Sequence, residues 1–203
     1  MTIALPAAPE FGTPIQPHPL PEFLSFLATR RSASAVTLAE PAPSPAEIET
    51  LIALAARVPD HGKLSPWRFI VLDQEGKAGL ADRLEALALS RGDQRAAAKL
   101  AKLKMPPVGV AVVSRTRPHE IPEWEQLLSA GAVCTTLLYA TLALGYGANW
   151  ITDWYAYDDE AKAILGLEAG ERVAGFVFMG TPKEPPLERE RPDSKALTTL
   201  WRP

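Results

Sequence analysis

The chain has little cysteine, little excess charge and few histidines for its 203 residues. Its single cysteine, Cys134, excludes an internal disulfide and suits a reducing cytoplasm. His18, His61 and His119 are far apart in the sequence, and none has metal-ligand spacing with Cys134. We therefore expect no metal site. A formal net charge of −3 and a pI near 5.7 argue against a nucleic-acid-binding surface, which needs a basic patch.

Several motifs that bind nucleotides or support nucleophilic catalysis are also absent. The stretch "GYGANW" begins like a dinucleotide-binding loop, but it follows a predicted helix instead of a strand and lacks the third glycine. There is no phosphate loop of the G-x-x-x-x-G-K-[ST] type and no G-x-S-x-G elbow. Cys134 lies among apolar residues in the middle of a predicted helix, which favours a small core residue over a nucleophile.

Neither a secretory signal nor a membrane span is expected. Residues 1–20 are rich in proline and contain no lysine or arginine, which excludes a signal peptide and indicates an extended arm. The segment between Glu125 and Asp153 has no charged residue and is long enough to cross a bilayer. It contains Ser129 and several threonines, however, and has no basic flank. We interpret it as a central helix buried within a dimer, in a protein without membrane contact.

Hydrophobic periodicity and capping residues predict five longer helices, at 21–29, from the capping residue Ser44 to about 57, 77–90, 95–104 and about 122–144. A shorter helix is expected between Asp158 and Gly166. Runs of apolar residues predict strands at 68–73, 108–114, 148–152 and 172–180, and "ALTTLW" near the C-terminus has the pattern of an edge strand. Helices and strands alternate irregularly, so we predict an α+β sandwich with one domain, 21–203, after the arm 1–20.

Three segments carry candidate binding residues. In "RRS", Arg30, Arg31 and Ser32 offer forked donors and a hydroxyl that suit a phosphate monoester. Taken alone, the segment is more simply a solvated basic helix end.

The other two segments are aromatic and polar. "RVPDHGKLSPWRF" places Arg57, His61 and Lys63 in a loop that is either a binding site or a surface loop anchored by Trp67. "GANWITDWY", residues 147–155, is on its own most simply the edge of a core strand.

Together these segments resemble the nitroreductase family of FMN-dependent oxidoreductases, in its short and compact branch. The matching motifs are, in order, "RRSAS", "R-x-P-D-H…PW-x-F", "P-x-WEQ-x-x-SAG", "G-x-x-W" and "GF-x-x-x-GTP". The resemblance extends from about Pro21 onward. It implies a mostly antiparallel central sheet flanked by helices, in a homodimer with FMN bound in clefts at the subunit interface.

The resemblance implies two groups of residues on the FMN phosphate and its ribityl chain. Arg30, Arg31 and Ser32 match the segment that binds the phosphate and the ribityl chain. Arg189 and Arg191, in "ERERP", resemble a basic pair near the C-terminus that closes on the phosphate.

A second set of implied contacts lies along the flavin ring. Arg57 and His61 match ring-contacting positions that the other subunit is expected to donate, and Trp150, Ile151 and Thr152 match the segment along the isoalloxazine. Two features depart from the family pattern. Asp60-His61 stands where many members have Ser-Asn, and Ile151 stands where a relative offers a polar side chain, so that a contact there is expected through the backbone or packing.

The resemblance further implies a cytoplasmic enzyme that carries out its chemistry on FMN and has no catalytic triad. NADH or NADPH would reduce the flavin, and an electron-poor acceptor such as a nitroaromatic or a quinone would then reoxidise it, in a ping-pong reaction. Arg57 and, after it, Lys63 are candidates for the positive charge near the N1 edge of the reduced ring. Two alternatives stay open: an FMN-binding storage or sensor protein with little turnover, and a related flavoenzyme with a different reaction.

Overall fold

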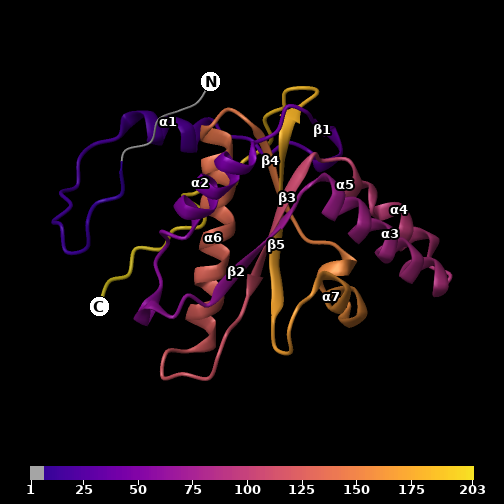
Figure 1. Cartoon of the computed structure of the whole chain (residues 1–203). Helices are drawn as coiled ribbons and strands as arrows, with labels where there is room; N and C mark the ends of the chain where they lie inside the picture. Colours follow the sequence, from indigo (N-terminus) through magenta and orange to yellow (C-terminus); the bar gives the residue numbers. More distant parts are fainter. Residues whose placement is uncertain (1–6) are drawn as a thin grey trace.

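A computed structural model describes residues 7–203, and it is an α+β fold built on one open sheet (Figure 1). The longest strand, β5 (Arg172–Pro182), pairs with β3 (Val108–Ser114), with β4 (Gly147–Ile151) and, at its end, with the short β1 (Leu38–Ala39). The strand β2 (Trp67–Leu72) pairs with the free edge of β3. Every pairing is antiparallel, as predicted for the family.

The alternation of side chains along β3 and β5 gives the sheet two buried faces. On one face, Val110 and Val177 pack with helices α2 (Pro45–Ala55) and α6 (Glu123–Ala143). On the other face, Phe176 and Phe178 pack with α3 (Gln74–Ser90), α5 (Ala101–Lys104) and α7 (Asp159–Leu165). Figure 1 shows α2 and α6 on one side of the strands and α3, α5 and α7 on the other.

Local sequence signals set several helix ends where we predicted them. Ser44 and Glu47 form a capping box at the start of α2, in which the Ser44 hydroxyl accepts from the Glu47 N–H and the Glu47 carboxylate accepts from the Ser44 N–H. Asp158 caps α7, which Gly166 ends in the left-handed conformation with a φ of 81°. The helix α3 begins three residues before the predicted Lys77, because the Asp73 carboxylate caps the Gly76 N–H.

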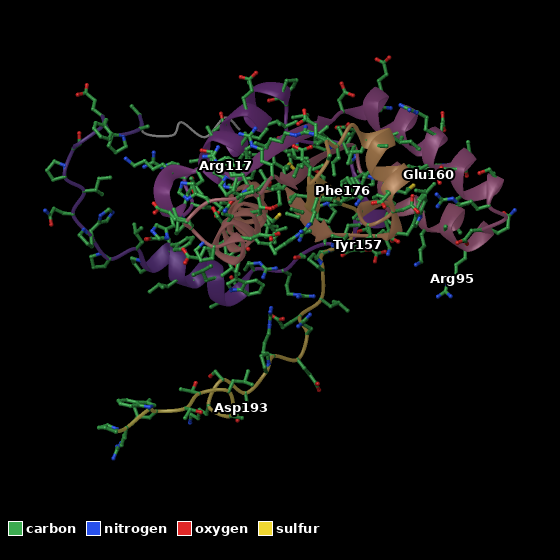
Figure 2. The ribbon with its side chains drawn as sticks, turned by 90° about the horizontal axis from the view of Figure 1, so that it is seen from below. Arg95, Arg117, Tyr157, Glu160, Phe176 and Asp193 are labelled. Carbon is green, nitrogen blue, oxygen red and sulfur yellow. The ribbon has the colours of Figure 1, made fainter. Side chains whose placement is uncertain are left out.

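Two predictions about the elements are wrong. The helix expected at 95–104 is divided into α4 (Gln94–Lys99) and α5, because the chain turns at Leu100. The "ALTTLW" tail forms no edge strand, and no strand follows β5 in the described chain. Its backbone turns back on itself instead, since the N–H groups of Leu197 and Thr198 donate to the carbonyls of Ser194 and Lys195. Figure 2 shows this tail, with Asp193, leading away from the body of the protein.

The uncharged segment of the sequence forms α6. By length and composition this helix is apolar enough to cross a membrane, but 44% of its most apolar window is buried within the protein. Val133, Cys134 and Leu137 are completely buried against the sheet and α2. Burial raises the pKa of the Cys134 thiol to about 12, which keeps it protonated and agrees with a core residue. We therefore interpret α6 as a core helix.

Candidate functional site

One large cavity of about 820 Å³ opens between the segment that begins at Arg30 and the C-terminal tail. The segment Arg30–Thr37, which follows helix α1 (Pro21–Thr29), forms one wall. Side chains of α6 and β4 form the floor, and the tail segment 184–191 forms the other side. We call it the arginine cavity, because four arginines line it: Arg30, Arg31, Arg189 and Arg191.

Arg30 is held in place by contacts that leave part of its guanidinium available. Its Nη2 donates to the Ser32 hydroxyl at 3.0 Å, and its Cζ lies 5.4 Å from the centre of the Tyr139 ring, a cation–π contact. Its Nε is buried and has no hydrogen-bond partner among residues 7–203. A buried donor without a partner costs free energy, so this nitrogen is suited to an acceptor that enters the cavity.

The other arginines are oriented by the tail. The Arg31 Nε donates to the Leu187 carbonyl at 2.8 Å, which links the two walls of the cavity. Arg191 forms an ion pair with Glu188 at 2.8 Å and also reaches the Arg30 carbonyl at 3.5 Å. The tail thus brings its basic pair to the "RRS" segment, although Arg30 and Arg191 are 161 positions apart in the sequence.

The floor of the cavity is formed where β4 passes the "RRS" segment. The Ala33 N–H donates to the Ala148 carbonyl at 3.0 Å, and the Asn149 amide donates to the Ala33 carbonyl. These bonds fix the wall to the sheet. The Asn149 Oδ1 is buried and lacks a donor in the described chain, so it is a second polar atom suited to a ligand.

The Trp150 indole lies over Gly175 of β5, two residues from Val177, the β5 residue that pairs with Trp150. The Trp150 indole N–H donates to the Ala174 carbonyl at 3.3 Å. A Cβ added to Gly175 would overlap this indole, at Nε1 and Cδ1. Only glycine therefore leaves room for Trp150 in this position.

Six of the ten predicted site residues line the arginine cavity, and four do not. Those that line it are Arg30, Arg31, Ser32, Trp150, Arg189 and Arg191. Ile151 ends β4 and packs in the core on the opposite face of the sheet. Thr152 follows the strand, and its hydroxyl lies 2.6 Å from the Tyr157 hydroxyl. Within one chain, these two residues do not contribute side chains to the cavity.

Arg57 and His61 lie away from the cavity, beyond the end of α2. Arg57 is exposed and lines a separate hollow of about 520 Å³ beside residues 7–9. The His61 Nδ1 lies 2.6 Å from the Glu125 carboxylate at the start of α6. Asp60, at the departure from the family pattern, accepts the backbone N–H groups of Leu64 and Ser65 and so closes its own loop. A single chain does not bring this loop to the "RRS" segment.

The sequence interpretation missed several residues of the cavity. Tyr139 and Thr135 lie one turn apart on α6, within the stretch that we interpreted only as a buried helix. The feature that could have identified them is a polar or amphipathic side chain on the less buried side of that helix. Asn149 lies within "GANWITDWY", and an amide in the middle of a short, partly buried strand was the signal that would have identified it.

Comparison with known proteins agrees with this geometry. Residues 27–181 match the model of a family described as the Nitroreductase family. A protein of Escherichia coli strain K12 named "Putative NAD(P)H nitroreductase YdjA" is 31% identical over 163 residues, which cover 79% of this chain and 88% of that protein.

Two solved structures share the fold. The nitroreductase-like family protein from Bacillus cereus has a TM-score of 0.79 and 18% identity, and covers 92% of this chain and 98% of its own. A nitroreductase with bound FMN from Bacteroides fragilis has a TM-score of 0.68 and 18% identity, and covers 89% of this chain and 99% of its own. At these identities the likeness establishes the α+β architecture, as expected for the family.

Proposed function

Since the chain belongs to the nitroreductase family, we propose that it is an FMN-dependent oxidoreductase. It takes hydride from NADH or NADPH and passes electrons to a nitroaromatic, a quinone or a similar electron-poor acceptor, in a ping-pong reaction. Bound FMN supplies the redox chemistry, which explains why no catalytic triad is needed. We place this activity in a single domain, residues 21–203, of a cytoplasmic protein.

The observation that carries the proposal is the arginine cavity itself. Its volume of about 820 Å³ is within the range of cofactor-binding clefts. Four arginines along its walls match the charge of a phosphate monoester. The buried Arg30 Nε and Asn149 Oδ1, both without partners in residues 7–203, supply one donor and one acceptor for a ligand that carries both kinds of group.

We assign the roles of the residues from their positions. Arg30, Arg31 and Ser32 hold the phosphate, and Arg189 and Arg191 close over it from the tail. Asn149 accepts a hydrogen bond from the ribityl chain or the ring, and Trp150 forms the wall beside the ring. All of these side chains already line the cavity, so none of them has to move to a different part of the protein to take its role.

A homodimer completes the site in this proposal. Helix α1 buries none of its residues within the chain, and Phe23 and Leu24 are 49% and 66% exposed. On α6, Trp124 and Leu128 are 66% and 54% exposed and lie one turn apart. Such neighbouring apolar side chains favour a subunit interface.

The second copy of the chain also accounts for the residues that lie outside the cavity. In the proposed dimer it brings Arg57 and His61 to the flavin ring, with Arg57 or Lys63 supplying positive charge near N1. Arg57 and Lys63 are exposed in the single chain, and so are available to a partner.

One observation supports a second candidate, an FMN-binding storage or sensor protein with little turnover. Asp60 and His61 are both engaged within their own chain, Asp60 with its loop and His61 with Glu125. If they stay engaged in the dimer, the ring lacks the contacts that this loop would otherwise provide.

Purified protein tests the proposal by its colour. It should bind FMN and turn yellow, NADH or NADPH should bleach the flavin without oxygen, and a nitroaromatic or quinone should restore the colour. A preparation that takes up no FMN would overturn the proposal. FMN that is bound but never bleached by either nicotinamide would favour the storage or sensor protein.

A further inference from the structure

A second cavity, of about 250 Å³, lies on the far side of the wall that bounds the arginine cavity. Thr37 lines the arginine cavity, whereas the next two residues, Leu38 and Ala39, line this one. After β5, Glu184 lines the first and Lys183 lines the second. We call it the lysine cavity, because Lys77, Lys104 and Lys183 all line it.

Lys77 is the unusual residue of the lysine cavity. It lies in the second turn of α3 and is only 3% exposed, yet its ammonium makes no hydrogen bond or ion pair within the described chain. Burial lowers the pKa of this ammonium, and the charges of Asp73 and Glu40 oppose the shift. The Lys77 Nζ is not one of the fully buried unpartnered atoms of the described chain, so the ammonium keeps access to the cavity that Lys77 lines. An anion there would compensate its partial loss of hydration.

The other two lysines line the same cavity from the end of α5 and from the residue after β5. The Lys183 N–H donates to the Thr37 carbonyl at 3.0 Å, which fixes Lys183 beside β1. Lys104 ends α5, and its Nζ is 2.8 Å from the Glu85 carboxylate, in a pair whose side chains are 40% and 39% exposed. Such an exposed pair is weak and leaves the lysine able to turn to another anion.

The lining also sets the chemistry of the ligand. Lys77, Lys104 and Lys183 line the cavity with one carboxylate, that of Glu40, so the lining carries an excess of two positive charges once Lys104 leaves Glu85 for the ligand. The Gln74 amide adds a neutral donor, and Met105–Pro107 add an apolar wall. The cavity has room for a small phosphorylated molecule and is much smaller than the arginine cavity.

We propose that the lysine cavity is a second ligand site, which binds a phosphate group, either as inorganic phosphate or on a small phosphorylated metabolite. Lys77 is the central contact, and Lys104 and Lys183 complete it. A compact dianion matches the excess charge of the lining. This site is separate from the arginine cavity and does not depend on the function proposed there.

Equilibrium dialysis with radiolabelled inorganic phosphate tests the site. The protein is first saturated with FMN and freed of excess, and ionic strength is fixed with chloride. Wild type should show saturable binding, and Lys77→Met should weaken it about tenfold or more, as the loss of a charge-assisted bond predicts. Lys195→Met, which changes a lysine of the exposed tail, should bind like wild type.

Lys183→Met keeps the test decisive if Lys77→Met folds poorly, because Lys183 is exposed. It should also weaken phosphate binding. No saturable binding in wild type, or full binding in both variants, would overturn the site. If FMN does not bind at all, the difference between wild type and the lysine variants still reports on this cavity alone.

Competitors separate the sources of the phosphate group. Glycerol 3-phosphate that displaces the label more strongly than unlabelled inorganic phosphate supports a metabolite, and the reverse order supports the free ion. Acetate that competes as well as phosphate would overturn the assignment to phosphate.

Discussion

Arginines on the two sides of the sheet have different surroundings. On the side of α3 and α7, Arg68 donates two hydrogen bonds to the Glu171 carboxylate, at 2.7 and 2.6 Å. On the side of α6, Arg30 has no carboxylate partner in the described chain, and its buried Nε makes no hydrogen bond.

The presence or absence of a carboxylate partner distinguishes Arg68, which has a structural role, from Arg30, which we assign to a ligand. Arg68 joins β2 to the turn before β5, and its charge is neutralised within the fold. The Arg68 guanidinium accordingly holds the pKa of Glu171 below its usual range. Arg30 is positioned by a hydroxyl and an aromatic ring, neither of which neutralises it. Variants on each side should therefore affect different properties.

Gly175→Val should give the largest effect, because it changes both the wall of the arginine cavity and the packing of the sheet. A side chain there displaces Trp150 from the cavity and overpacks β4 against β5. We expect the free energy of unfolding to fall by about 1–3 kcal/mol and FMN binding to weaken. Urea unfolding and FMN titration measure the two effects.

The matched control is Gly79→Ala on α3, where an added Cβ meets no atom within 4 Å. It should stabilise the protein slightly, since alanine is the better helix former by about 0.5–1 kcal/mol. A Gly175→Val protein as stable as this control, with unchanged FMN affinity, would contradict the role of the glycine.

Glu171→Gln should affect the fold and not the cavity. Removing the charge partner of Arg68 should lower the free energy of unfolding by about 1.5–3 kcal/mol, toward the lower end because the Arg68 side chain is 29% exposed. FMN affinity should be unchanged. Glu160→Gln, in the exposed pair with Arg91, should have a smaller effect on unfolding. Weaker FMN binding by Glu171→Gln would break the distinction between the two sides.

The same ion pair should set part of the acid sensitivity. Because the pKa of Glu171 is lowered in the folded state, its contribution is present above the unfolded value of about 4.5 and is lost as the pH falls through the folded value. Asp158, whose pKa is lowered chiefly by Arg91, acts in the same direction. Stability should therefore decline below about pH 4.5, and less steeply in Glu171→Gln. An identical acid limb in both proteins would contradict this origin.

Much of the fold was predictable because local signals and burial coincide. The capping box at Ser44, the end at Gly166 and the apolar runs of β3 and β5 each specify an element within a few residues. The two-residue strand β1 has no such signal, because its pairing with β5 depends on tertiary contacts. The apolar pattern of "ALTTLW" wrongly predicted a strand, because a strand forms only where it can pair with the edge of a sheet.

The site was predictable in part, through the order of its motifs. The "RRS" segment, Trp150 and the tail arginines meet in one cavity because β4 and the tail both pass the end of α1. Asn149 and Tyr139 were missed because their partners come from elsewhere in the chain. Arg57 and His61 are predicted to act from a second subunit, and this prediction depends on the proposed homodimer.

The most direct test of the central claim compares FMN with riboflavin, which lacks the phosphate. Arg30→Ala should weaken FMN binding about 10- to 150-fold, the loss of one charge-assisted hydrogen bond, and should leave riboflavin affinity unchanged. This result would assign Arg30 to the phosphate. Equal losses for both ligands, or no loss for FMN, would contradict the account.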